Sequence, residues 1–586
     1  MSRFVTGRRV GAVLATMALS TTTLAVVATG GAGASAHHAK TKHSFSAPTT
    51  SSSTTSSTTL SHDVLTVGTY ANKPGQYQTI QAAVDAAKPG DTILVAPGDY
   101  KETADLTNWN DATAAHGGFG AVLVTTPNLT IRGLNRNTTI IDGTKGAGTC
   151  SSAPADQQFG YVQNNKAAGR NGIVVYEANN VSIDNLTTCN FLTGNDGGGN
   201  GVWWNGGADT ATINLHGYEG SYLSATSTYF AGESAAASYG IFSSDAAGPA
   251  TWSHIYANNQ NDSGMYVGAC KQLCGITITD AWMENSALGY SGTNSGGAIV
   301  ITNSRFDHNK DGFDTNTQIA GDPPAPQNGA CPNNGISPIT HTHSCWVLEN
   351  SVFNANNNPN VPEAGTAAGG PTGTGMTLSG GRNDTVMNNT FSNNNAWGLL
   401  LVPYPDSSPP EYGQSCTKTG GIELAPFGCV YDPMNDAVLN NTFTSNGSFG
   451  NPSNGDLGQL DLNGNQPSNC FVGNKDAGAK GLTQAGQQLQ STFKTCGVNR
   501  SAPSAPLSLL GQVLCDTGFG GCSKTSNYPK PTGVKLTTLP GNTLGSRTSS
   551  TLLANTSTTA LPTMPNPCQG VPDSLWCSGG QLIPSN

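Results

Sequence analysis

The chain has 586 residues, of which only 11% are charged, and its 26 Lys and Arg stand against 36 Asp and Glu, for a net charge of −10. Nucleic acids and anionic membrane surfaces are bound by clustered Lys and Arg, so this balance argues against both partners. Gly occurs 74 times, which fits a structure of many tight turns, because Gly tolerates positive φ.

Residues 1–36 have the pattern of a secretory signal. Three arginines come first, residues 10–27 are largely apolar, and Ala34-Ser35-Ala36 has the form of a cleavage site. The alternative is a membrane anchor, but polar residues 20–23 interrupt the apolar run, and no later stretch is apolar for long enough to span a bilayer. We therefore expect an exported, extracellular protein.

The 14 cysteines agree with export, because disulfides persist in oxidising compartments. Their spacing favours seven local pairs, although sequence cannot prove connectivity. Zinc is the alternative for Cys270 and Cys274, but no second Cys or His pair follows at a finger-like distance. The expected pairs are Cys150/Cys189, Cys270/Cys274, Cys331/Cys345, Cys416/Cys429, Cys470/Cys496, Cys515/Cys522 and Cys568/Cys577.

Residues 37–63 read as a Ser/Thr-rich linker that is too polar to pack, and the folded region is expected over residues 64–496. Residues 77–87 predict a short helix, since their apolar side chains fall on one face, and residues 91–98 predict a strand. Such a helix would cover the open apolar end of a stack of coils.

Short strands follow, and a seven-residue phrase, Asn-x-x-Phe-x-x-Asn, keeps returning. Glycines that begin strands recur at steps of 23–25 residues, as at Gly240, Gly264, Gly289 and Gly312. A fixed period of this size marks a repeat architecture, whose units bury their apolar faces only by stacking. The four copies of the phrase are Asn303–Phe306–Asn309, Asn350–Phe353–Asn356, Asn388–Phe391–Asn394 and Asn440–Phe443–Asn446.

This pattern resembles the right-handed parallel β-helix proteins of the pectate-lyase-like superfamily. The resemblance covers residues 64–475 and rests on the repeated phrase and on an opening signature. It implies an all-β solenoid with a short N-terminal capping helix, Asn ladders at the turns and stacked Phe inside. The superfamily holds lyases, hydrolases, esterases, epimerases and adhesins, so it leaves the chemistry open. The signature is Tyr77-Gln78-Thr79-Ile80-Gln81-Ala82-Ala83, Pro89-Gly90-Asp91-Thr92-Ile93 and Gly98-Asp99-Tyr100.

Two regions interrupt or follow the coils. Residues 318–344 form the largest insertion, which contains His341 and His343. These histidines could bind a metal, but no carboxylate is close in sequence, so we interpret them as loop residues. After Cys496 the apolar density falls, and residues 497–586 are expected to be an extended Pro/Ser/Thr-rich tail with two Cys loops.

A candidate binding face follows from strand alternation. If each Gly starts a strand and the next residue points inward, the residue after it points outward. Trp203, Phe242 and Tyr266 are then exposed rings that suit substrate binding, because sugar faces stack on aromatic rings. The alternative is that loops such as residues 217–232 cover them. The outward row is Val174, Trp203, Phe242, Tyr266, Ser291, Asp314, Thr377 and Leu400.

The sharpest polar cluster is the run from Asp307 to Asp314. Asp311 and Asp314 flank an inward Phe, so their carboxylates could converge on one hard cation. The further oxygen ligands could be Asp307, Asn309 or Asn316. The run Asp311-Gly312-Phe313-Asp314 looks like the calcium motif of polysaccharide lyase family 9. That likeness implies that Asp311 and Asp314 hold calcium, which bridges to a uronate carboxylate.

Two departures from that family weigh against catalysis. Lys310 stands where the family has a further ligand Asp, and Thr377 stands where it places the catalytic Lys. A β-eliminating lyase needs a strong base, for which Lys310 and Arg382 are the candidates here. Carboxylates beside Lys310 would raise its pKa, which is the wrong direction for a base, and the alternative is that Lys310 simply neutralises them.

Two functions therefore stay open. The first is binding of an extracellular acidic polysaccharide, with calcium-dependent, lyase-like cleavage if the protein is an enzyme. Hydrolysis with Asp311 and Asp314 as acid and base is a further chemistry for the same polymer. The second function is a non-catalytic glycan-binding or structural β-helix protein of the cell surface or cell wall, which Thr377 favours. We expect a monomer in either case.

Overall fold

The computed structural model describes residues 62–103, 119–195, 197–207, 213–318, 323–365, 367–406, 416–424, 428–462, 467–478, 481–499, 506–518, 520, 522–539 and 560–585. The predicted signal and all but the last two residues of the predicted linker lie outside these ranges. Among the described residues, no helix is both long and apolar enough to cross a membrane.

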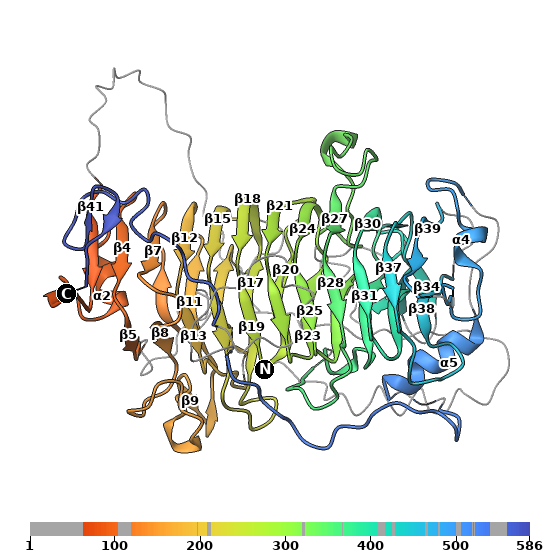
Figure 1. The fold of residues 1–586 in the computed structure, drawn as a ribbon, viewed down its shortest axis with the longest axis horizontal. Coiled ribbons are helices and arrows are strands. Elements are labelled where there is room, and N and C mark those ends of the chain that lie inside the picture. The colour runs from red at the N-terminus through yellow and green to blue at the C-terminus, as the bar shows by residue number, and fades with distance from the viewer. Residues whose placement is uncertain are drawn as a thin grey trace.

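Three long parallel sheets run the length of the molecule, and successive strands of the chain pass from one sheet to the next (Figure 1). The ten-stranded sheet consists of β6 (Phe119–Val124), β11 (Arg170–Tyr176), β14 (Val202–Asn205), β17 (Ala237–Ser244), β20 (Gln260–Gly268), β23 (Leu288–Thr293), β26 (Asp311–Asn316), β29 (Thr374–Ser379), β32 (Trp397–Val402) and β38 (Gly455–Gln459). The fold is a right-handed parallel β-helix, as the repeat predicted.

The other two sheets complete each coil. The twelve-stranded sheet consists of β1 (Val64–Val67), β4 (Thr92–Val95), β7 (Thr130–Gly133), β12 (Val181–Asp184), β15 (Leu215–Ser221), β18 (Ala246–Ser253), β21 (Leu273–Thr279), β24 (Gly297–Thr302), β27 (Trp346–Glu349), β30 (Asp384–Met387), β36 (Ala437–Leu439) and β39 (Cys470–Val472). The eleven-stranded sheet consists of β5 (Gly98–Tyr100), β8 (Thr139–Asp142), β13 (Thr187–Cys189), β16 (Ser224–Thr226), β19 (Tyr256–Asn258), β22 (Trp282–Glu284), β25 (Arg305–Asp307), β28 (Val352–Asn354), β31 (Thr390–Ser392), β37 (Thr442–Thr444) and β40 (Lys475–Asp476).

The repeated phrase builds the interior of the coils. Its Phe rings stack with centroids 4.6–5.0 Å apart and planes 11° apart. Its second Asn forms a ladder, in which each side-chain amide donates to the next carbonyl oxygen at 3.1–3.2 Å. Its first Asn has positive φ, between 49° and 57°, which Asn tolerates better than most residues. The phrase is therefore scaffold, as expected.

The Asn ladder also explains the glycine repeat. A Cβ added at Gly312 would lie 2.7 Å from the side-chain amide of Asn356, and one added at Gly375 would lie 2.8 Å from that of Asn394. Only glycine leaves room for the ladder at these corners. Because a Cβ at these glycines would point at the ladder, the residue before each glycine faces away from the interior.

Short elements lie outside the three sheets. Helix α2 (Ile80–Ala86) begins where the side chain of Thr79 accepts a hydrogen bond from the amide of Ala82, and it packs on β1, β4 and β6. The other described elements are α4 (Leu489–Thr492), α5 (Leu507–Asp516), η1 (Pro154–Asp156), η2 (Pro332–Asn334), η3 (Ala367–Gly369), β2 (Thr69–Tyr70), β3 (Lys73–Pro74), β9 (Val162–Gln163), β10 (Lys166–Ala167), β33 (Tyr404–Asp406), β34 (Ile422–Leu424), β35 (Gly428–Tyr431), β41 (Cys577–Ser578) and β42 (Gln581–Leu582).

All seven predicted disulfides are present. None of the cysteines in the described part of the chain is free. The zinc alternative at Cys270 and Cys274 is therefore wrong, because the two are bonded to each other.

The described residues of the C-terminal part of the chain lie along the stack and end at its N-terminal end, where residues 568–583 pack on β4 (Figure 1). We call residues 522–539 and 560–585 the return segment. It makes hydrogen bonds to successively earlier coils: Asn527 to Asn451, Thr532 to Asn360, Asn285 to Lys535, Thr537 to Asn259, Thr563 to Asn185 and Trp576 to Lys73.

Candidate functional site

The outward row predicted from sequence lies in register across the ten-stranded sheet. Each member pairs with the next: Val174 with Trp203, Trp203 with Phe242, Phe242 with Tyr266, Tyr266 with Ser291, Ser291 with Asp314, Asp314 with Thr377 and Thr377 with Leu400. The neighbouring Met265, Tyr290 and Phe313 belong to the interior core, so the row faces outward.

The aromatic end of this row is not the open platform that we expected. Phe242 and Tyr266 are 8% and 6% exposed, and only Trp203 is half-buried. The rings cover one another, because coils lie as far apart as stacked rings do. Trp203 stacks on Phe242 with centroids 5.0 Å apart, and Tyr239 packs 4.6 Å from Phe242 and 5.1 Å from Tyr266. Binding of substrate by these rings stays a prediction, with Trp203 the accessible member.

Asp311 and Asp314 both lie on β26 and are 0% and 3% exposed. Asp311 accepts hydrogen bonds from Thr377 Oγ1 at 2.8 Å and from the amide of Phe313. Asp314 accepts from Ser379 Oγ at 2.7 Å and from the side chain of Asn316 at 3.2 Å. Burial, and then the charge of Asp314, raise the pKa of Asp311 well above its usual value, and burial raises that of Asp314 to about 7.

Asp307 does not join these two carboxylates, so its expected place in the same calcium site is wrong. The chain turns a corner at Asn309, and Asp307 lies on β25 of the eleven-stranded sheet. There it is buried against Arg305, which donates to one oxygen from Nε at 2.8 Å and also from Nη2. Trp282 Nε1 donates to the other oxygen at 2.5 Å.

A second polar cluster forms around Asp307. Glu284 and His308 lie near it, with ligand atoms within 4.8 Å of one another. Burial works against the charge of Asp307, but the hydrogen bond from His308 and the charge of Arg305 outweigh it, so the pKa of Asp307 is lowered. Burial, and then the charge of Asp307, raise the pKa of Glu284 to about 7.

The two candidate bases are engaged elsewhere. Lys310 Nζ forms an ion pair with Glu363 at 2.7 Å and donates to the carbonyl of Ala368, so it neutralises Glu363 rather than Asp307. Arg382 donates to the carbonyl of Gly420 at 2.6 Å, beside the β33–β35 hairpin, and burial lowers its pKa. Neither makes a hydrogen bond or ion pair to Asp311 or Asp314 in the described structure. A role as base for either stays a prediction.

Five outer-face side chains are buried yet carry a polar atom without a hydrogen-bond partner in the part of the chain that the structure describes. All lie beside Asp311 and Asp314 on four consecutive strands of the ten-stranded sheet, and all are at most 3% exposed. An unpaired buried polar group costs about 1–3 kcal/mol, so each of them requires an explanation. The atoms are Ser263 Oγ on β20, Ser291 Oγ and Thr293 Oγ1 on β23, Asn316 Oδ1 on β26 and Thr374 Oγ1 on β29.

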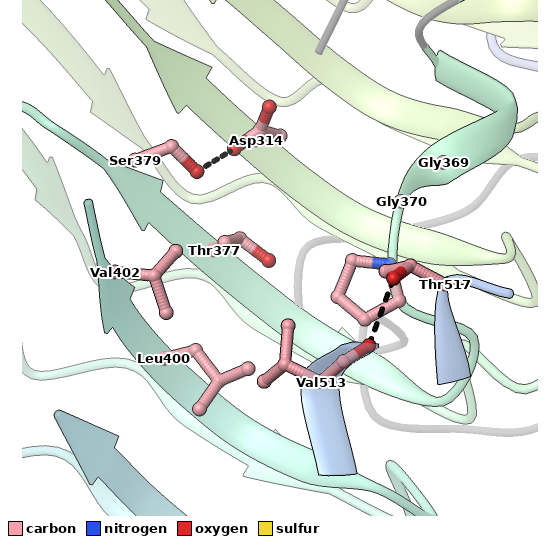
Figure 2. Close-up of a pocket in the computed structure, with 10 residues that line it drawn as sticks. Asp314, Gly369, Gly370, Thr377, Ser379, Leu400, Val402, Val513 and Thr517 are labelled. Atoms are coloured by element: carbon pink, nitrogen blue, oxygen red, sulfur yellow. Dashed lines mark hydrogen bonds between the residues drawn. The ribbon is translucent and has the colours of Figure 1, made fainter. Parts of the chain in front are cut away.

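Two segments cover this face. The segment around η3 lies over β20, β23 and β26, where Ala364 donates to the carbonyl of Asn261 and Ala367 packs on Leu288. Helix α5 lies over β29 and β32. A cavity of about 10 Å³ remains between the cover and the sheet, which is at the limit for one water molecule. Figure 2 shows Asp314, Thr377 and Ser379 on its sheet side and Val513 and Thr517 on its helix side.

The oxygen donors on this face suit a hard divalent cation. Asp311 and Asp314 supply two carboxylates, and the partnerless oxygens of Ser291 and Asn316 lie on the same strand or the next one. Calcium prefers several such oxygens, and its charge would offset the burial that raises both pKa values. The residues fit the ion in kind, with Asp307 excluded from the set.

Helix α5 is the feature that sequence reasoning missed. The tail was expected to be extended, yet residues 507–516 have a hydrophobic stretch, Leu507-Ser508-Leu509-Leu510-Gly511-Gln512-Val513-Leu514, long enough for a short amphipathic helix. That stretch was the available signal. It cannot say which face of the coils the helix covers.

No protein-family model matches the chain, and no curated protein sequence matches it. Solved structures do resemble it. The A-module of the mannuronan C-5 epimerase AlgE6 from Azotobacter vinelandii is 14% identical, over 70% of this chain and 91% of that one, with a TM-score of 0.43. An alginate lyase from Paenibacillus sp. is 14% identical, over 72% and 98%, with a TM-score of 0.32. A tailspike protein of E. coli bacteriophage HK620 is 11% identical, over 70% and 64%, with a TM-score of 0.39.

Proposed function

We propose that this chain binds an extracellular polysaccharide on the outer face of the ten-stranded sheet. The observation that carries the proposal is the set of partnerless, buried hydroxyl and amide groups on β20, β23, β26 and β29. A sugar chain offers hydroxyl groups that both donate and accept, so it satisfies such groups where an apolar ligand does not. Trp203 continues the same row with a half-buried ring on which a sugar face can stack.

An acidic polymer fits the centre of this face through calcium. Asp311 and Asp314 would hold the ion, which would supply a positive charge for a uronate carboxylate. Without a cation, the same two carboxylates repel a uronate, so acidic ligands require the metal and neutral ones do not. This difference makes the class of polymer testable.

The contacts of Lys310 and Thr377 favour a protein that binds the polysaccharide without cleaving it. The ammonium group of Lys310 donates to Glu363 and to the carbonyl of Ala368, and the hydroxyl group of Thr377 donates to Asp311. A lyase base must present a free lone pair to a carbon-bound proton, which an ammonium donor in an ion pair does not. If the protein cleaves a ligand without calcium, acid–base hydrolysis is favoured, because burial raises the pKa of Asp314 to about 7 and it keeps a proton to donate near neutral pH.

The test measures binding of oligogalacturonates and of a neutral glucan with calcium and with chelator. We expect Ser291→Ala combined with Thr293→Val to weaken binding about threefold to thirtyfold, since two hydrogen bonds are lost. Ser392→Ala, on the outer face of the eleven-stranded sheet, is the matched control and should bind as the wild type does. Equal binding by the double variant overturns the proposal, and unsaturated products detected by ultraviolet absorbance would establish a lyase instead.

A further inference from the structure

Helix α5 covers the part of the outer face formed by β29 and β32, next to strands that the proposed ligand contacts. Its side chains Leu509 and Val513 are 0% and 2% exposed and pack in one cluster with Leu400 and Val402 of β32. Leu400 is in register with Thr377, which is in register with Asp314. The helix therefore covers the direct continuation of the row that carries Trp203 and Asp314.

The sheet has room for the helix at a particular position. Gly458 of β38 pairs with Leu400, so it belongs to the same outward row. A Cβ added there would lie 2.6 Å from Leu400 and 3.4 Å from Leu509. The absence of a side chain at Gly458 thus lets the helix approach the sheet.

The contact between helix and sheet is nevertheless imperfect. The cavity beside Asp314 leaves part of the interface unfilled. Asp516 ends the helix, although a carboxylate at a helix C-terminus faces the negative end of the helix dipole. Both of its carboxylate oxygens are shielded and lack a well-formed hydrogen bond in the described structure, and they face Asp311, Lys310 and the amide of Thr372.

The helix is also tethered so that it can leave the sheet without leaving the molecule. The Cys515–Cys522 disulfide joins its C-terminal end to the return segment. Tyr528 of that segment donates to Gln512 of the helix at 2.9 Å and accepts from Asn454 at 3.1 Å. The return segment has separate anchors further on, at Asn360 and Asn259, which do not involve the helix.

We propose that helix α5 is a built-in lid, which competes with the polysaccharide for the outer face of β29 and β32, so that ligand reaches Thr377 and Leu400 only when the helix has swung off. This inference rests on the proposed function, because the competing ligand is the polysaccharide. The packing of Leu509 and Val513 closes the lid. The unfilled cavity and the buried carboxylate of Asp516 make the closed state less stable, so that a bound ligand can take the place of the helix.

Hydrogen–deuterium exchange of the full chain tests whether the lid opens by itself. Amides of residues 507–516 should exchange at least about 100-fold faster than those of β29 and β32, because local opening needs less free energy than unfolding of the coils. Leu509→Ala should accelerate exchange in α5 alone, and Ser508→Ala, at an exposed position of the same helix, should not. Exchange of α5 in step with β29 and β32 overturns the lid.

Binding of oligogalacturonate in the presence of calcium tests the competition. Leu509→Ala should tighten binding about tenfold, because it weakens the closed state, whereas a purely structural helix predicts no gain. Unchanged affinity in Leu509→Ala, with its faster exchange confirmed, overturns the inference. If the helix opens locally but neither this probe nor a neutral glucan binds any variant, the proposed function fails and the inference fails with it.

Discussion

Asp307 and Asp311 are four residues apart, yet they occupy opposite kinds of environment. Asp307 accepts hydrogen bonds from Arg305 and Trp282 on the eleven-stranded sheet, and its pKa is lowered. Asp311 and its neighbour Asp314 lie on the ten-stranded sheet among hydroxyl and amide groups, and their pKa values are raised. The corner at Asn309 makes the difference. A buried carboxylate with a matched cation stabilises a fold, whereas a buried pair without one is costly and is a better candidate for a site.

Replacement of Asp307 is the strongest test of the difference between the two environments. Asp307→Asn should lower the free energy of unfolding by about 3–5 kcal/mol, because the buried guanidinium of Arg305 loses its carboxylate partner. Chemical denaturation measures the change. Asp314→Asn is the matched control on the other side of the corner, and a loss of the same size there would remove the distinction between the two environments.

The raised pKa of Asp314 predicts the pH dependence of stability. Below about pH 4 its carboxyl group is protonated in both the folded and the unfolded chain. As pH rises, the unfolded chain releases the proton first, so stability falls until pH passes the folded value of about 7 and then levels off. Asp314→Asn should remove this part of the slope and gain roughly 1–3 kcal/mol at pH 8 over the wild type.

Calcium should reduce the gain in stability that Asp314→Asn gives at pH 8. If Asp311 and Asp314 bind the ion, saturating calcium at pH 8 stabilises the wild type through mass action, by roughly 2–3 kcal/mol at a hundredfold excess over the dissociation constant. Asp314→Asn should lose this stabilisation and Asp307→Asn should keep it. Thermal denaturation with calcium and with chelator gives the answer, and equal shifts in both variants would place the ion elsewhere.

His308 supplies the smallest expected effect. Its hydrogen bond to Asp307 raises its pKa, so it contributes stability at pH below about 6.5 and loses this contribution as pH rises through the folded value. The side chain is 47% exposed, which limits the contribution to about 0.5–1 kcal/mol. His308→Gln should therefore cost more stability at pH 5.5 than at pH 8.5, and a constant cost would indicate that the ion pair is not formed.

The repeating parts of the molecule could be predicted from the sequence. The Phe stack and the Asn ladder follow from a phrase whose period matches one coil, and local spacing was enough to pair all the cysteines. The outward row was also predictable in register, because glycine fixes the start of each strand.

The parts that sequence could not reach depend on contacts between distant segments. The repeated phrase implied a turn at Asn309, but the sequence did not show that this turn separates the side chain of Asp307 from those of Asp311 and Asp314. Thr377 is covered by residues 507–516. The hydrophobic stretch in these residues does not indicate on which coils the helix packs. Burial of Phe242 also depends on Tyr239, which packs 4.6 Å from its ring and does not belong to the predicted row.

The return segment sets a limit on how the molecule can change in length. Thr537 and Lys535 contact Asn259 and Asn285, which lie one coil apart, so two extended residues of the segment span the ~4.8 Å step of one coil. Several coils added between Asn259 and Asn451 would leave residues 527–537 too short to reach both anchors, and deleted coils would leave these residues slack. Residues 527–537 thus limit the length of this part of the stack, and its growth by duplication of several coils, the easiest way for a solenoid to grow, requires a matching insertion far away in the chain.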